Sequence, residues 1–251
     1  MKDKIAIIAH GLSGGGAERV ASIVANYFAD LNYQVLFVAA YSEKREYELD
    51  PRIRYAAVKT NSSGGMMRFI ERSFSIRNMV REFGAEIAFS FITNELIPLE
   101  FSGVEVIPSL RIDPKSTDSS FIRRHIRRFV YHHAKNVIFQ TEDAKNYFDG
   151  SIRKKGVIIG NPLKRHLPVW DEEGHRKIFM TACRITKQKN IPMLINAFIR
   201  FHQDYPDYGL EIYGDGEPAG YKEKMEGYVA EKGAAGYIVF KGHLPDIHNI
   251  M

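Results

Sequence analysis

Cysteine is almost absent from this sequence. Its 251 residues include only Cys183, so an internal disulfide and a multi-cysteine metal site are both excluded. No apolar run approaches the roughly 20 residues that a membrane-spanning helix needs. Residues 1–4 lead directly into a predicted strand and not into a signal-peptide core. We therefore expect a cytoplasmic protein.

The sequence also lacks the patterns of several enzyme classes. No Gly-x-Ser-x-Gly segment is present, and Cys183 has no histidine close to it in sequence. His132, His133 and His243 have no acidic or cysteine companions at the spacing of metal ligands. We expect neither a nucleophilic hydrolase nor a metal site.

Acidic residues are missing from one segment of a chain whose net charge is only +5, residues 121–135. On a helix, Ile122, Ile126, Phe129 and Val130 would share one face and the arginines another. Three interpretations remain, which are a solvated face above a core-facing stripe, contact with anionic lipid, and nucleic-acid binding. Lipid contact would place the protein at the inner face of the membrane. Nucleic acid is not an expected partner, because no nucleic-acid module accompanies the charge.

Apolar runs alternate with helical patterns along the chain, and this predicts an α/β fold with a parallel sheet covered by helices on both faces. Strands are predicted over residues 4–10, 34–41, 52–58, 86–91, 105–110, 136–141 and 157–160, and then over 177–182, 209–213 and 237–241. The predicted domains are residues 1–163 and a smaller, partial domain at 177–251. Residues 164–176 between them lack periodicity and read as a linker.

Two cations follow the first strand of the second domain. Arg184 and Lys189 lie between the apolar run 178–181 and a predicted helix that begins at Ile191. Ligands of open α/β sheets bind at such a turn, where the planar guanidinium and the compact ammonium are both suited to phosphate. The alternative is that Lys187 and Lys189 only solvate a loop.

Glycines follow the first strand of the chain. Gly14, Gly15 and Gly16 precede a helical pattern, an arrangement that lets backbone amides approach a phosphate. The spacing is not Gly-x-Gly-x-x-Gly, so a dinucleotide site is not indicated. An oxidoreductase that uses a nicotinamide cofactor would need an acidic residue near the position of Glu43, and it remains a third alternative.

Met66 and Met67 follow a glycine loop and open a predicted helix at residues 66–83. They could form an exposed patch that seeks lipid. Methionine more often fills gaps in a core, and we expect these two side chains to be buried.

Several segments together resemble a known family. They are residues 14–20, 111–114, 139–141, 160–162, 184–190 and 210–216. The chain resembles, over nearly its whole length, the retaining glycosyltransferases of family four, which have two Rossmann-like domains in the GT-B architecture. The resemblance implies transfer of a hexosyl unit from a uridine or guanosine diphosphate sugar to a glycan or lipid-linked acceptor in polysaccharide biosynthesis. It implies retention of configuration and no metal cofactor.

The resemblance also assigns roles to the donor side of the site. Arg184 and Lys189 would be catalytic, because they neutralise the leaving diphosphate. The family's glycine loop, here Gly14 to Gly16, faces that diphosphate from across the interdomain cleft. The nucleotide would border the backbone of five residues, Gly214, Gly216, Gly242, His243 and Leu244. Plain turns remain an alternative for these residues, with Asp215 capping the next helix.

On the acceptor side, the resemblance assigns Arg111 and Asp113 to the acceptor or the sugar. Many members of the family have a histidine close to this point, and this chain has none there. The alternative is a local ion pair between the two residues before Pro114.

Two departures from the family pattern stand out. Cys183 occupies a position where glycine is usual. The family's second domain continues for about a hundred further residues, which carry a pair of glutamates that hold the donor. We therefore expect a C-terminally truncated enzyme that is inactive unless another chain supplies that pair. The alternative is a non-catalytic fragment that binds lipid or a partner.

Overall fold

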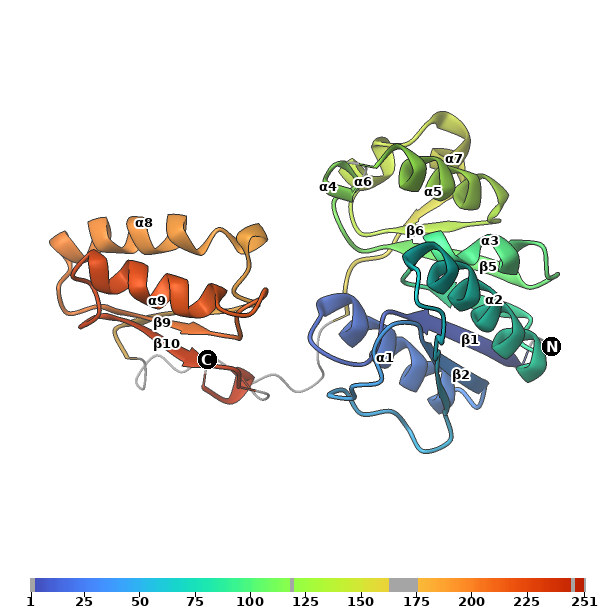
Figure 1. Ribbon diagram of the computed structural model, residues 1–251, viewed down its shortest axis with the longest axis horizontal. Coiled ribbons are helices and arrows are strands. Elements are labelled where there is room, and N and C mark those ends of the chain that lie inside the picture. Colours follow the sequence, from blue (N-terminus) through green and yellow to red (C-terminus); the bar gives the residue numbers. More distant parts are fainter. Residues whose placement is uncertain (1–2, 118–119, 163–175, 245–246, 251) are drawn as a thin grey trace. The chain divides into compact units, whose positions relative to one another are not determined.

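The computed structural model describes residues 3–117, 120–162, 176–244 and 247–250. The chain divides into two compact units, Met1–Leu163 and Lys164–Met251, and each is described by itself (Figure 1). The predicted linker at residues 164–176 lies outside the described residues except for Arg176.

The first unit contains a parallel sheet of seven strands in the order β3-β2-β1-β4-β5-β6-β7. The strands are β1 (Lys4–Ala9), β2 (Gln34–Ala39), β3 (Arg54–Ala57), β4 (Ile87–Ser90), β5 (Glu105–Leu110), β6 (Val137–Phe139) and β7 (Gly156–Ile158). Strand β1 pairs with β2 on one side and β4 on the other, so the strand order reverses between β1 and β4. The predicted parallel α/β fold is confirmed.

Helices cover both faces of this sheet. They are α1 (Gly16–Asp30), α2 (Gly65–Phe83), α3 (Ile97–Glu100), α4 (Pro114–Thr117), α5 (Phe121–His133), α6 (Glu142–Asn146) and α7 (Gly150–Lys155), with a 3-10 turn η1 (Asn94–Leu96). Helix α1 packs on one face through Ala21, Ala25 and Ala29. Helices α2, α3, α5 and α7 pack on the other face, where Figure 1 shows α2 and α5.

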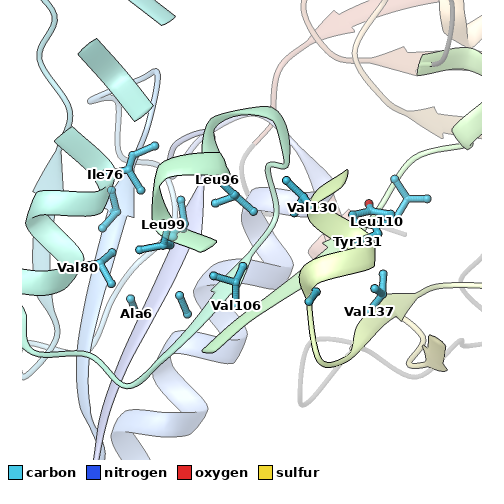
Figure 2. Close-up of a cluster of buried hydrophobic side chains, with 14 of the residues drawn as sticks. Ala6, Ile76, Val80, Leu96, Leu99, Val106, Leu110, Val130, Tyr131 and Val137 are labelled. Atoms are coloured by element: carbon cyan, nitrogen blue, oxygen red, sulfur yellow. The ribbon is translucent and has the colours of Figure 1, made fainter. Parts of the chain in front are cut away.

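The larger core of the first unit lies beneath α2, α3 and α5. Figure 2 shows Ile76 and Val80 of α2 beside Leu99 of α3, with Val106 of β5 and Val130 of α5 further along. All five side chains are at most 2% exposed. Burial of an aliphatic side chain of this size stabilises the fold by about 2 kcal/mol. This core therefore fixes the helices that support the carboxyl edge of the sheet.

The prediction for Met66 and Met67 is wrong. Their exposed fractions are 71% and 59%, and Ile70 and Phe74 on the same helix are also exposed. Helix α2 starts at Gly65 and buries the face that contains Ile76 and, among others, Val80, so the apolar residues of its first turns point to solvent. We call Met66, Met67, Ile70 and Phe74 the α2 stripe.

The core-facing stripe, one of the three interpretations of residues 121–135, agrees with the structure only in part. Ile122 is 68% exposed, whereas Arg127 is only 5% exposed and lies beside the buried residues Val130 and Tyr131. Residues 127, 130 and 131 are three and four positions apart and therefore share a face of α5. The apolar residues spaced from Ile122 indicated one face of α5. The face that is buried against the rest of the unit is rotated around the helix axis from that one.

The second unit contains a three-stranded parallel sheet in the order β10-β9-β8. Its elements are β8 (Ile178–Ala182), η2 (Lys187–Lys189), α8 (Ile191–Asp204), β9 (Gly209–Tyr213), α9 (Tyr221–Glu231), β10 (Ile238–Gly242) and η3 (Ile247–Ile250). Helices α8 and α9 lie on the same face of the sheet (Figure 1), around Ile195, Phe198, Leu210, Ile212 and Val229. The three predicted strands of this unit are confirmed.

Candidate functional site

Three loops of the second unit meet at the carboxyl edge of its sheet. The Cys183 amide donates to the last carbonyl of β9 over 3.0 Å, and the Gly214 amide donates to Gly242 O over 2.8 Å. The Ile185 amide and the Glu217 amide continue the pairing beyond β8 and β9. Ligands of open parallel sheets bind at this edge. We call the loops that follow β8, β9 and β10 the carboxyl-edge surface.

Glycine is required at two points of this surface. A Cβ at Gly214 would lie 1.9 Å from Cys183 O, and the φ angle of Gly214 is +138°. A Cβ at Gly216 would lie 2.7 Å from the Lys222 amide nitrogen. The backbone is therefore packed closely where the loops after β8 and β9 run side by side. Asp215 does not cap the next helix, because α9 has Gly220 at its N-cap, so the capping part of that alternative is wrong.

Arg184 follows β8 and is exposed at the carboxyl-edge surface. Its Nη1 donates to Glu217 Oε2 over 2.8 Å, and the two side chains are 53% and 61% exposed. An ion pair this exposed contributes little stability, so an incoming phosphate can displace the carboxylate. Glu217 was not predicted as a site residue. Its only signal in the sequence is its position directly after the Gly-Asp-Gly turn.

Lys189 is the last residue of η2 and lies directly before Asn190, which is the N-cap of α8. Its side chain is exposed, and no ion pair within the described ranges involves it. His243 and Leu244 follow β10 and are exposed as well. The structure therefore brings the predicted residues Arg184, Lys189, Gly214, Gly216, Gly242, His243 and Leu244 to one edge of the second unit.

The predicted glycine loop of the first unit lies at the carboxyl end of β1. Gly15 is the N-cap of α1, and the helix starts at Gly16. The Gly14 amide donates to Glu46 Oε2 over 2.8 Å, and the Tyr47 hydroxyl donates to Gly15 O over 3.2 Å. One amide of the loop thus already binds a carboxylate of the protein.

Arg111 lies at the carboxyl end of β5 and is half-buried. Its Nε donates to Ser109 Oγ over 2.8 Å, while Nη1 donates to Asn161 Oδ1 over 2.9 Å and to Ile159 O over 3.3 Å. Burial lowers the pKa of Arg111. Asp113 is exposed, and one of its oxygens accepts from the Lys115 amide over 3.0 Å.

A cluster of aromatic and charged side chains at the carboxyl ends of β1 and β2 was not predicted from the sequence. The rings of His10 and Tyr41 stack with centroids 4.7 Å apart, and the Arg72 guanidinium carbon lies 3.9 Å from the Tyr41 centroid. The Tyr41 hydroxyl donates to Glu95, which is 4% exposed. Burial and then this carboxylate raise the pKa of Tyr41. These residues come from four separate segments, so no local pattern could have predicted the cluster.

Two negative findings concern the described residues only. They contain no group of three histidine, cysteine, aspartate or glutamate side chains that could hold a metal ion. No helix among them combines the length and the apolar character needed to cross a membrane.

Solved structures define the class of fold. The structure of HepE from Anabaena with UDP and glucose matches all of this chain and 72% of its own, with a TM-score of 0.76 and 14% identity. WaaG, a glycosyltransferase involved in lipopolysaccharide biosynthesis, matches 98% of this chain and 72% of its own, with a TM-score of 0.72 and 14% identity. The α/β fold with two parallel sheets therefore resembles that of the GT-B glycosyltransferases.

One similar protein extends the comparison to sequence. Over 244 residues the chain is 26% identical to the amylovoran biosynthesis glycosyltransferase AmsD of Erwinia amylovora. The matched region covers 92% of this chain and 68% of AmsD. No model of a known protein family matches the chain. Together with the fold, the similarity supports a glycosyltransferase of the GT-B type.

Proposed function

We propose that the chain is a glycosyltransferase, or a fragment of one, that moves a hexosyl unit from a uridine or guanosine diphosphate sugar to a glycan or lipid-linked acceptor in polysaccharide biosynthesis. The observation that carries this proposal is the carboxyl-edge surface of the second unit, with Arg184 and Lys189 on one of its loops. The UDP and glucose held by HepE support a nucleotide sugar as the donor.

The chemistry of the leaving group explains the two cations. The bond between the anomeric carbon and the diphosphate breaks, and negative charge grows on the diphosphate. Preorganised cations lower the energy of such a transition state. Arg184 offers planar donors after leaving Glu217, and Lys189 offers a compact charge. Gly214 and Gly216 bring the backbone close to the nucleotide, and Gly242, His243 and Leu244 border its base.

The stereochemical course that we propose is retention. The acceptor oxygen attacks the anomeric carbon on the face from which the diphosphate leaves, and a phosphate oxygen takes the proton of the acceptor hydroxyl. The configuration of the sugar is thereby kept, and no protein base is needed. A reaction that inverted the configuration would refute this part of the proposal.

The first unit takes the acceptor in this proposal, with Arg111 and Asp113 as contact residues. Gly14, Gly15 and Gly16 remain its candidate phosphate-binding loop, where an anion would compete with Glu46 for the Gly14 amide. The α2 stripe is exposed apolar surface of the first unit, and Phe121 and Ile122 are exposed apolar side chains of the basic helix α5 itself. We propose that they contact an anionic membrane on the cytoplasmic side.

A transfer assay tests the function. The full chain is incubated with UDP-hexoses and GDP-hexoses and with polyprenyl-linked saccharides, and the released nucleoside diphosphate and the anomeric configuration of the product are measured. Where the chain turns over, alone or with a second chain that supplies the missing glutamate pair, release should depend on acceptor and fall about a hundredfold in Arg184→Ala, because a stabilising donor is lost. Lys224→Ala, an exposed lysine of α9, is the matched control. Donor binding without turnover would instead favour a non-catalytic binding fragment.

A further inference from the structure

The Arg111 guanidinium is held in a fixed position by neutral oxygen atoms. Its three bonds end on a serine hydroxyl, an asparagine amide and a main-chain carbonyl, at 2.8, 2.9 and 3.3 Å. Ser109 belongs to β5 itself, whereas Ile159 and Asn161 follow β7. The guanidinium therefore joins two parts of the sheet edge that are 50 residues apart in sequence.

No carboxylate within the described ranges forms an ion pair with Arg111. Arg184 of the second unit, by contrast, is more exposed and is paired with Glu217. Besides these neutral acceptors, the described contacts of the guanidinium include the Phe91 ring, whose centroid lies 5.6 Å from the guanidinium carbon. Half-burial of a positive charge without an anionic partner is costly, and burial accordingly lowers the pKa of Arg111. The site thus has an excess of positive charge that the described part of the protein does not neutralise.

The guanidinium also keeps donors in reserve. Nε and Nη1 make the three bonds, and none of these bonds uses Nη2. Ile112, Ile159 and Asn161 around it are exposed, with fractions of 44% and 48% for the two isoleucines, so the edge is open to a ligand here. A planar guanidinium with free donors matches a carboxylate or a phosphate.

We propose that Arg111 binds an anionic group of the acceptor, so that the substrate class is a saccharide carrying a carboxylate or a phosphate near the hydroxyl that accepts the sugar. This inference rests on the proposed function and deepens it. The stacked rings of His10 and Tyr41 lie at the same edge of the sheet as Arg111. His10 follows β1 and Tyr41 follows β2, and a single strand, β4, lies between β1 and β5. Neighbouring strands are about 4.8 Å apart, so His10 and Arg111 follow strands about 10 Å apart along one edge.

The test uses the full chain and three defined probes. Methyl β-D-glucuronide carries a carboxylate, glucose 6-phosphate carries a phosphate, and methyl β-D-glucoside is the neutral match. Binding of the probes is measured by ligand-observed NMR at low ionic strength, and binding of UDP and GDP is measured by calorimetry on the same samples. The comparison of the two anionic probes tells an acidic sugar from a phosphorylated one.

Two variants separate recognition from a merely structural role of Arg111. Arg111→Gln removes the charge. Asn161→Asp places a carboxylate about 2.9 Å from Nη1 and supplies the missing counter-ion inside the protein. Asn78→Asp on α2 is the matched control, since it makes the same change at an exposed position. Thermal denaturation of all variants reports on folding.

We expect at least one anionic probe to bind about tenfold or more tightly than the neutral glucoside. Both variants should remove that preference, and neither should change the affinity for UDP. Asn161→Asp should keep or raise the melting temperature, because it pairs the buried charge. A control that loses the preference as well, or variants that keep it, would overturn the inference. Loss of UDP binding in Arg111→Gln would also overturn it, by assigning the anion site to the donor.

The failure of this inference differs from a failure of the proposed function. If UDP binds and Arg184→Ala abolishes that binding while no anionic probe is preferred, the inference is wrong and the donor site stands. If the anionic probe binds through Arg111 but neither UDP nor GDP binds, the acceptor site stands and the donor site is refuted.

Discussion

Single residues determine whether the carboxyl-edge surface can form. At Gly214 any side chain would collide with Cys183 O, and the positive φ angle adds backbone strain. A collision with main-chain atoms cannot be relieved by turning a flexible side chain. A substitution at Gly214 therefore tests whether the loops after β8 and β9 lie as close together as described.

We predict that Gly214→Ala destabilises the second unit by about 3 kcal/mol, since strain and collision act together. Thermal and urea denaturation of the full chain measure this change. Gly227→Ala is the control, because a Cβ at this helical glycine of α9 meets nothing within 4 Å. Removal of a glycine from a helix interior should stabilise the chain by about 0.5–1 kcal/mol. Equal effects of the two substitutions would contradict the close approach of the Gly214 backbone to Cys183 O.

Glu100 at the end of α3 is a partly buried acid whose Oε1 has no hydrogen-bond partner within the described ranges. Burial raises the pKa of Glu100 to about 7, against a partial opposing effect of Lys155. A raised pKa of an acid means that the folded state favours the protonated form. The ionised carboxylate therefore destabilises the fold, increasingly as the pH rises from about 4.5 to about 7.

We predict that Glu100→Gln raises the free energy of unfolding at pH 8 by about 1 kcal/mol and leaves it unchanged at pH 4. The value is kept small because Glu100 is partly exposed to solvent. Urea unfolding of the variant and the native protein at both pH values measures the difference. The same gain at pH 4 and pH 8 would show that ionisation of Glu100 is not the cause.

At the scale of elements, the short helix α7 depends on its first turn. Asp149 Oδ1 accepts from the Ser151 amide over 3.1 Å and from the Ile152 amide over 3.3 Å. The Ser151 side chain also donates to it, and these bonds lower the pKa of Asp149 to about 2. Stability from this cap is therefore complete above about pH 4 and is lost as the pH falls toward 2.

We predict that Asp149→Ala costs about 1 kcal/mol at pH 7, because two helical amides lose their acceptor. Asp149→Asn keeps an oxygen acceptor and should cost less. Asp149→Asn should also weaken the dependence of stability on pH between 4 and 2. Circular dichroism during urea unfolding measures both effects. An asparagine variant as unstable as the alanine variant would show that charge, and not capping, carries the effect.

The strands were the part of the fold most readily predicted. Those at residues 4–10 and 34–41 are uninterrupted apolar runs, and a parallel sheet buries both of its faces, so pattern and burial coincide. The facing of α2 and α5 was not predictable in the same way. Whether Met66 is covered, or Arg127 lies inward, depends on which neighbouring helices pack there, and local spacing does not contain that information.

The candidate site shows the same division. The loops that bear Arg184 and Gly214 could be found because each follows its own strand, and parallel strands end at a common edge. The partners of the charged side chains could not. Glu217 is 33 residues from Arg184 and Asn161 is 50 residues from Arg111, and only the folded chain brings them together.

At the scale of the whole molecule, charge and exposed apolar surface gather on the first unit. Its α2 stripe is exposed, and helix α5 of the same unit carries arginines and no acid. Apolar contact with the acyl chains and attraction to anionic headgroups would add to one another. The net charge of +5 acts in the same direction.

We predict that the chain floats with vesicles containing phosphatidylglycerol and much less with vesicles of phosphatidylcholine. Met66→Ser with Phe74→Ser should weaken flotation about tenfold, because two exposed apolar side chains are lost. Arg123→Glu with Arg124→Glu should act chiefly at low salt. Exposed Lys232→Glu in the second unit is the charge control. If flotation is the same with both lipids and is unchanged by the substitutions in the α2 stripe, this membrane contact is excluded.

In the proposed function, the carboxyl-edge surface of the second unit holds the diphosphate of the donor. Calorimetric titration of the full chain with UDP and GDP tests it most directly, beside Arg184→Ala, Lys189→Ala and the control Lys224→Ala. We predict that one nucleotide binds, that each of the first two substitutions weakens binding about tenfold or more, and that the control leaves it unchanged. Binding that survives the loss of both Arg184 and Lys189 would contradict the account.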